Sequence, residues 1–274
     1  MIRSLLYVPA HSERFIAKAH ERQADAIILD LEDSVPPEAK TAAREALADS
    51  IASVRRGGAK VFVRINSDDE AQLPDSVAAC VGGADGLMVP KVKDPADLSS
   101  LATIMECHEK RLGRDALQFI GLIEDPGAVL HAAAIARAPR LIALAIGGED
   151  LATAMGATPT PSVLHFPKLL VHYAAKAAGL LSLGLLRTIA DYSDLDGIAI
   201  AIREAREHGF DGATCVHPSA VALLNAGFAP SPAELAWATR VLALAETHDG
   251  AFSLDGQMID APILARARNI LLRA

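Results

Sequence analysis

Residues 141–150 read LIALAIGGED, an apolar run that ends in two glycines and an acidic pair. The same pattern occurs twice more, as LDLED at 29–33 and GLIED at 121–125. Each run is continuously apolar rather than alternating, which is typical of a strand in a parallel sheet that is buried on both faces. The sequence therefore predicts three buried strands that each carry carboxylates at the C-terminal end.

Apolar runs of this kind recur along the chain, and longer amphipathic, alanine-rich segments separate them. The predicted strands are 4–9, 26–33, 60–66, 86–92, 118–125, 141–150, 180–186 and 212–218. Helices are predicted at 36–54, 95–113 and 194–209, with Pro or Asp near their starts and Gly ending the last two. Strand–helix alternation at this spacing indicates βα units.

Eight βα units in about 220 residues predict a (β/α)8 barrel of the TIM type, which usually needs about 250 residues. An open doubly wound sheet is the competing architecture. Such a sheet usually has a glycine-rich phosphate turn after its first strand, and this chain has VPAHSER at 8–14 instead. We therefore favour the barrel.

The strand–helix rhythm changes near residue 229. Residues 231–248 predict a helix, 249–262 are polar and irregular, and a last helix closes the chain. We expect a catalytic barrel over 1–228 and a C-terminal helical arm over 229–274. The arm either plugs the base of the barrel or reaches an active site, its own or that of a neighbouring subunit.

Composition narrows the possible partners and the compartment. The net charge of −8 does not favour nucleic-acid binding, which usually requires a positively charged surface. The three cysteines are widely spaced and form no CxxC motif, which favours buried thiols in a reducing compartment. The N-terminal apolar stretch is too short for a signal peptide, and no run approaches the roughly 20 residues of a membrane helix. We expect a cytoplasmic protein without membrane contact.

The acidic strand ends predict a cation site. Side chains alternate along a strand, so only one carboxylate of each pair faces the barrel mouth, and the other caps a helix or pairs with a base. Converging carboxylates repel one another and need a cation. Without a Cys or His cluster the ligands are oxygens, which suits Mg²⁺ or Mn²⁺. One carboxylate from GLIED and one from GGED meet the needs of Mg²⁺, which fills its other positions with water and substrate.

Groups for a substrate anion flank this predicted cation site. Arg64 and Lys91 supply positive charge on neighbouring strands, and an enolate or dianion is the natural occupant between metal and guanidinium. Gly147 and Gly148 have no side chains, so a ligand can approach the backbone there. Glu149 follows them directly. His217 is expected to be structural. Other histidines lie on predicted helices and are expected to be solvated or packing residues, such as His108, His172 and His208.

These motifs resemble those of the HpcH/HpaI aldolase and citrate lyase β-subunit family. The resemblance implies a modified (β/α)8 barrel that assembles as a homotrimer or hexamer. It also implies C–C bond chemistry next to a coenzyme A (CoA) or carrier-protein thioester, with a small 2-oxo acid as the second partner. The segments that carry it, in family order, are 3–10, 28–35, 63–66, 89–91, 122–125, 147–151, 209–218 and 255–262.

The resemblance also implies roles for single residues. Glu124 and Asp150 match Mg²⁺ ligands, and Arg64 matches an arginine that holds the substrate and the developing enolate. Asp260 matches an acid/base aspartate contributed by a neighbouring subunit. Basic positions near the CoA phosphates correspond to Arg14 and Lys18. Substrate contacts are expected from Arg64, Glu124, Gly148 and Glu149.

Three departures from the family pattern bear on substrate identity. Pro9-Ala10 stands where many members have Pro-Gly, and Lys168 stands where many have arginine. Residues 185–194, LLRTIADYSD, lack an aspartate that many lyases carry after the seventh strand. None of these departures involves the Glu124–Asp150 pair.

The implied activity is Mg²⁺-dependent cleavage of a 3-hydroxy-3-carboxyacyl-CoA, of the citramalyl-CoA or malyl-CoA type. The products are an acetyl-CoA-type thioester and a 2-oxo acid such as pyruvate or glyoxylate. The alternatives are a citrate lyase β subunit that acts on a carrier-bound citryl thioester, and an acyl-CoA thioesterase on the same scaffold. A CoA-binding protein without turnover and an aldolase acting on free oxo acids are more distant possibilities.

Overall fold

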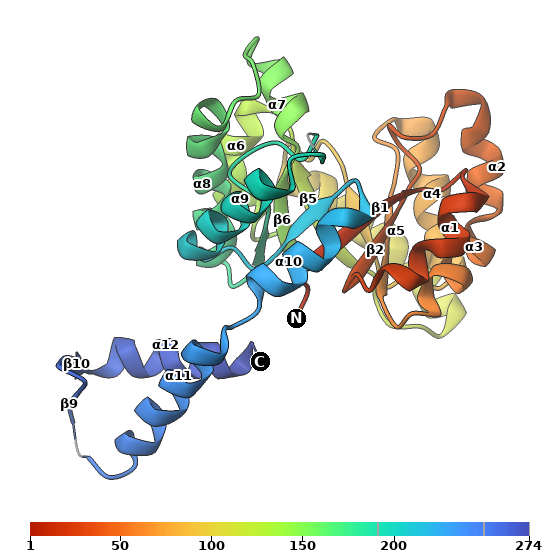
Figure 1. The fold of residues 1–274 in the computed structure, drawn as a ribbon. Coiled ribbons are helices and arrows are strands. Elements are labelled where there is room, and N and C mark those ends of the chain that lie inside the picture. Colours follow the sequence, from red (N-terminus) through yellow and green to blue (C-terminus); the bar gives the residue numbers. More distant parts are fainter. Residues whose placement is uncertain (191, 249, 274) are drawn as a thin grey trace.

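Parallel strands form a single eight-stranded sheet that curves around a central axis (Figure 1). The computed structural model describes residues 1–190, 192–248 and 250–273. The sheet order is β7-β6-β5-β4-β3-β2-β1-β8, and a bridge between Leu183 and Gly212 joins its two edges. The prediction of a (β/α)8 barrel is therefore confirmed. The strands are β1 (Ser4–Pro9), β2 (Ala26–Asp30), β3 (Lys60–Arg64), β4 (Gly86–Val89), β5 (Gln118–Ile123), β6 (Leu141–Ile146), β7 (Leu181–Leu183) and β8 (Ala213–Cys215).

Helices surround the sheet and connect its strands. The predictions at 95–113 and 194–209 correspond to α5 (Pro95–Leu112) and α9 (Leu195–His208). Gly113 and Gly209 follow them as C-caps, with left-handed φ of 63° and 94°. The single helix predicted over 36–54 is wrong, because a 3-10 turn and two short helices that meet at Ala46 replace it. The barrel helices are α1 (Glu13–Ala19), α2 (Lys40–Glu45), α3 (Leu47–Arg55), α4 (Asp69–Val81), α5 (Pro95–Leu112), α6 (Pro126–Ile135), α7 (Gly148–Ala154), α8 (Pro161–Ala177), α9 (Leu195–His208) and α10 (Val221–Phe228).

Two separate apolar cores follow from the alternation of side chains along the strands. One core fills the barrel interior, with Leu5, Ile28, Phe62 and Met88 among its members. A larger core lies between the sheet and the helices, and Ile27 belongs to it. The same alternation continues to the C-terminal ends of the strands, where it decides which side chains face the barrel mouth.

Strands β5 and β6 end before the acidic residues that follow them, whereas β2 includes Asp30. β5 stops at Ile123, so Glu124 and Asp125 lie beyond it, and β6 stops at Ile146. Asp125 caps α6 by accepting hydrogen bonds from the backbone N–H groups of Gly127 and Ala128, at 2.8 and 3.3 Å. This confirms that one member of an acidic pair faces the helix layer. Glu149 and Asp150 were predicted at the end of the strand 141–150. They lie instead in the first turn of α7.

The C-terminal arm contains α11 (Pro232–Ala245), a hairpin of β9 (Phe252–Leu254) and β10 (Gln257–Ile259), and α12 (Ala261–Leu272). The description of 249–262 as irregular is wrong for the hairpin. Its two-residue turn is Asp255-Gly256, with φ of 51° and 78°, a sequence that favours such turns. Ala238, Val241 and Ala267 belong to a small apolar core within the arm.

The arm extends away from the barrel beyond α10 (Figure 1). Among the described residues, two ion pairs connect it to the barrel. Arg206 Nη2 lies 2.6 Å from Glu234 Oε2, and Arg273 Nη2 lies 2.8 Å from Asp211 Oδ1. An arm in this position does not fill the barrel base. Among all the helices of the described segments, none has the length and apolar character needed to cross a membrane.

Candidate active site at the barrel mouth

A cavity of about 440 Å³ opens at the C-terminal ends of the strands. This is the end at which (β/α)8 barrels carry their active sites. The cavity brings together residues that lie far apart in the sequence and that the sequence analysis had selected. These are Arg64, Glu124, Gly148, Glu149 and Asp150.

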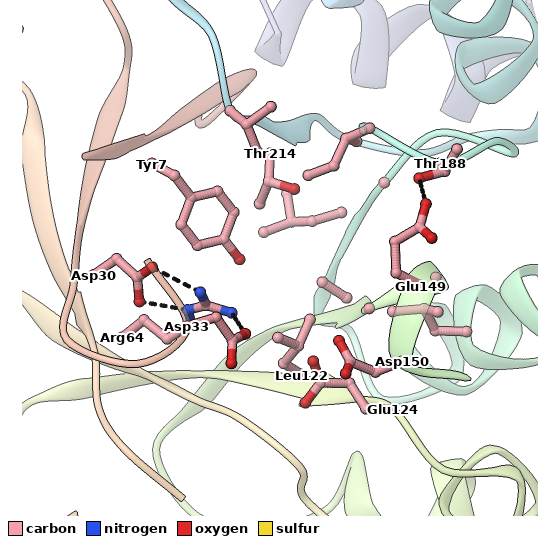
Figure 2. A pocket seen from close by; sticks show the side chains of 18 of the residues that line it. Tyr7, Asp30, Asp33, Arg64, Leu122, Glu124, Glu149, Asp150, Thr188 and Thr214 are labelled. Carbon is pink, nitrogen blue, oxygen red and sulfur yellow. Dashed lines mark hydrogen bonds and ion pairs between the residues drawn. The ribbon is translucent and has the colours of Figure 1, made fainter. Parts of the chain in front are cut away.

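The carboxylates of Glu124 and Asp150 both line this cavity and lie close together (Figure 2). Glu124 is buried, and its Oε2 accepts a hydrogen bond of 2.8 Å from the backbone N–H of Lys91. Burial raises the pKa of Glu124 to about 7, and the charges of Glu32 and Asp150 add to that rise. Glu124 is therefore costly to ionise unless a cation joins the site.

The surroundings of this pair fit Mg²⁺. A Cβ atom on Gly147 would lie only 2.5 Å from Glu124 Oε1, so glycine leaves the space that the carboxylate needs. The described residues contain no group of three or more His, Cys, Asp or Glu side chains that could hold a metal ion. Two carboxylates are nevertheless enough for Mg²⁺, which commonly completes its six positions with water and substrate oxygens.

Arg64 is held by acidic side chains on the opposite side of the cavity (Figure 2). Its Nε and Nη2 donate to the two oxygens of Asp30, each at 2.7 Å, and its Nη1 donates to Asp33 at 2.9 Å. Burial alone would raise the pKa of Asp30, but the bonds and charge of Arg64 hold it below its usual value. The acidic run at 29–33 therefore orients the guanidinium group.

Glu32 links Arg64 to Lys91. Its oxygens lie 3.2 Å from Arg64 Nη1 and 3.1 Å from Lys91 Nζ. Neither oxygen makes a hydrogen bond of good geometry with another described residue. The two ion-pair distances are short enough that we regard Glu32 as paired with both cations. Burial nevertheless raises the pKa of its carboxyl group.

The segment after β7, which departs from the family pattern, forms one wall of the cavity. Lys168 is buried and donates from Nζ to the carbonyls of Leu185 and Arg187, at 2.7 and 2.8 Å. Burial lowers the pKa of Lys168 to about 8. Thr188 in the same segment donates to Glu149 (Figure 2). Hydrogen bonds to Lys168 and Glu149 thus hold this segment in place.

A second cavity of about 370 Å³ adjoins the first. Arg14 and Lys18, both on α1, line it, so the structure brings these two predicted residues together. Tyr7, Pro9 and Val216 line both cavities. The two cavities therefore share a wall.

Asp260 is not brought to the mouth within this chain. It caps α12 in the arm, where its Oδ1 accepts a hydrogen bond of 3.4 Å from the backbone N–H of Ile263. It does not line either cavity. His217 stacks on Tyr192 and caps a 3-10 turn, and it also lines the second cavity together with Arg14 and Lys18.

Fold and site together define a (β/α)8 barrel with a paired-carboxylate, arginine-containing pocket at its C-terminal mouth. The chain belongs to the HpcH/HpaI aldolase/citrate lyase family, whose sequence model matches residues 3–218.

Relatives with assigned names agree over almost the whole chain. A (3S)-malyl-CoA thioesterase of Cereibacter sphaeroides (strain ATCC 17029 / ATH 2.4.9) is 34% identical over 99% of this chain and 94% of its own length. A mitochondrial citramalyl-CoA lyase of Rattus norvegicus is 32% identical over 99% of this chain and 86% of its own.

A solved structure agrees with the fold. It is the CitE protein of Mycobacterium tuberculosis in complex with magnesium, acetoacetate and coenzyme A. Its TM-score is 0.80 and its sequence identity 32%, over 99% of this chain and 97% of that one.

Proposed function

We propose that the protein is a Mg²⁺-dependent carbon–carbon lyase. Its substrate is a 3-hydroxy-3-carboxyacyl-CoA of the citramalyl or malyl type, and its products are a shorter acyl-CoA and a 2-oxo acid. The observation that carries the proposal is the placement of Glu124 and Asp150 opposite Arg64 in a cavity that adjoins the Arg14–Lys18 cavity. The named lyase relative and the magnesium, acetoacetate and CoA of the solved relative support it.

Glu124 and Asp150 would hold Mg²⁺, or Mn²⁺ in its place. When bound there, the ion would supply Lewis acidity at the acid end of the substrate. Gly148 and Glu149 bound the space in which that end lies. The donor set contains only oxygen, which is the set that these ions prefer.

Arg64 acts on the thioester end. A base in the cavity accepts the proton of the substrate hydroxyl, and that oxygen becomes the carbonyl oxygen of the oxo acid as the C–C bond breaks. The electron pair of that bond passes into the thioester, whose oxygen gains negative charge as an enolate. Asp30 and Asp33 already fix the guanidinium group, so little reorganisation is needed when this charge develops. Protonation of the enolate carbon then releases the acyl-CoA.

Asp260 supplies that proton from a neighbouring subunit in this proposal. The barrel of 1–228 and the arm of 229–274 then belong to different active sites of a homotrimer or hexamer. The support is the position of Asp260 at the start of α12, in an arm that projects away from its own barrel (Figure 1).

Subunit mixing tests the shared site. Asp260→Ala and Arg64→Ala proteins are each expected to be inactive, whereas unfolding and refolding them together should restore part of the activity. Each variant refolded alone is the control. If mixed oligomers form and remain as inactive as the parents, Asp260 does not act across an interface.

A substrate panel tests the reaction. Malyl-, β-methylmalyl-, citramalyl- and citryl-CoA are incubated with Mg²⁺ or with EDTA, and the oxo acid is measured. We expect one substrate to give oxo acid only with Mg²⁺, and Asp150→Asn to abolish this. Asp94→Asn, at the exposed N-cap of α5, is the matched control and should stay active because asparagine caps helices as well as aspartate.

Thioester hydrolysis is the second candidate function, because a 34%-identical relative carries the name of a thioesterase. It predicts free CoA and an intact hydroxy diacid, with no oxo acid. A carrier-bound citryl thioester is a further possibility, and turnover of the carrier thioester without turnover of the CoA thioester would support it.

A further inference from the structure

Tyr7 occupies the junction of the two cavities. It lies on β1, and its ring packs against the apolar core of the barrel interior. Figure 2 shows its hydroxyl group directed into the cavity. The guanidinium carbon of Arg64 lies 5.1 Å from the centre of the ring. Tyr7 and Arg64 therefore approach the same region of the mouth from neighbouring positions.

The hydroxyl group of Tyr7 has a weak partner. It donates to the thioether sulfur of Met88 at 3.0 Å, and thioethers are poor acceptors. Burial raises the pKa of the phenol, so the group keeps its proton and remains a donor. A donor that makes only a weak bond is available for a stronger acceptor when a ligand arrives.

The two cavities fix where the thioester of a bound substrate lies. Glu124 and Asp150 define the acid end, and Arg14 and Lys18 define the phosphorylated end. The thioester joins these two parts of the molecule, so its carbonyl must pass the shared wall that includes Tyr7. That carbonyl oxygen gains charge as the C–C bond breaks, and a preorganised donor there lowers the barrier.

We propose that Tyr7 is a further catalytic residue that donates a hydrogen bond to the thioester oxygen and shares its developing negative charge with Arg64. Tyr7 keeps its proton throughout, so the proton balance of the cleavage is unchanged. This role rests on the proposed lyase function. A hydrogen bond to an oxyanion is much stronger than one to a thioether. The gain therefore appears in the transition state rather than in substrate binding.

Tyr7→Phe removes the hydroxyl group and keeps the ring beside Arg64. We expect kcat for oxo-acid release to fall by about 100-fold, the usual effect of losing one oxyanion donor. KM should change little, and the melting temperature should stay close to that of the wild type. Tyr173→Phe is the matched control, because Tyr173 lies on α8 with 60% of its surface exposed. That variant should have the kinetics of the wild type.

Met88→Leu separates the proposed role from a structural one. If Tyr7 acts by holding Met88, this variant should lose as much kcat as Tyr7→Phe, and that result would overturn the proposal. Unchanged kcat in Tyr7→Phe, or a change in KM alone, would also overturn it while the lyase function stands. Wild-type protein that releases no oxo acid from any thioester would overturn both proposals together.

Discussion

Proton-linked Mg²⁺ binding is a direct consequence of the Glu124–Asp150 geometry. Glu124 carries a proton below a pKa of about 7 in the metal-free protein, and a carboxylate must lose its proton to bind the ion. The ionised fraction of Glu124 changes about tenfold between pH 8 and pH 6, so the Mg²⁺ dissociation constant should rise about tenfold over that range. Affinity therefore increases as the pH rises through 7.

The stability of the metal-free protein should change in the opposite direction. The folded state holds this proton more tightly than the unfolded chain, because the pKa is raised from 4.5 to about 7. Between pH 4.5 and 7 the carboxyl group is protonated in the folded state but ionised in the unfolded chain. The free energy of unfolding therefore falls by roughly 3 kcal/mol as the pH rises through this range. Mg²⁺ binding offsets that loss.

Isothermal titration of Mg²⁺ at pH 6, 7 and 8, in buffers with different heats of ionisation, measures both the affinity and the protons released. About 0.9 proton per ion is expected at pH 6 and about 0.1 at pH 8. Glu124→Gln should abolish the proton release and weaken binding at every pH. Equal affinity at pH 6 and pH 8 without proton release would refute the placement of Glu124 in the ion site.

Further predictions follow from single contacts. Gly147→Ala should weaken Mg²⁺ binding at least about tenfold, because its Cβ would displace the Glu124 carboxylate; binding like that of the wild type would contradict this. Arg64→Lys should lower stability by about 3 kcal/mol and cleavage by about 100-fold or more, since lysine cannot make the paired bonds to Asp30. Urea unfolding measures the stability and oxo-acid release measures the cleavage rate. If neither falls, a positive charge alone is sufficient at position 64. Asp125→Ala should cost about 1 kcal/mol through the lost α6 cap and leave kcat unchanged; a large loss of kcat would instead place Asp125 in the site.

Strand positions could be predicted because buried parallel strands are continuously apolar, and side-chain alternation then fixed which residues face inward. Alternation predicted that one carboxylate of GLIED faces the mouth, and the family resemblance selected Glu124; both Arg64 and Glu124 line the cavity. The limits of the strands were less predictable. β6 ends at Ile146 because α7 begins directly after Gly147, so Glu149 and Asp150 are positioned by a helix rather than by a strand.

Contacts between distant segments could not be predicted from local pattern. Tyr7 looked like one more core residue of β1, and only the folded barrel shows that its hydroxyl group reaches the cavity. Thr188 and Lys168 became relevant because the segment after β7 folds back onto Glu149. The hairpin of the arm was missed because its strands are only three residues long, although Asp255-Gly256 was a usable turn signal.

The central claim is that this site breaks a carbon–carbon bond next to a thioester. Its most direct test is the ratio of 2-oxo acid to free CoA formed from citramalyl-CoA and malyl-CoA with Mg²⁺, followed by mass spectrometry from the first turnovers. The account predicts one oxo acid for each acyl-CoA product and no free CoA. Free CoA with an intact hydroxy diacid, and no oxo acid, would contradict it.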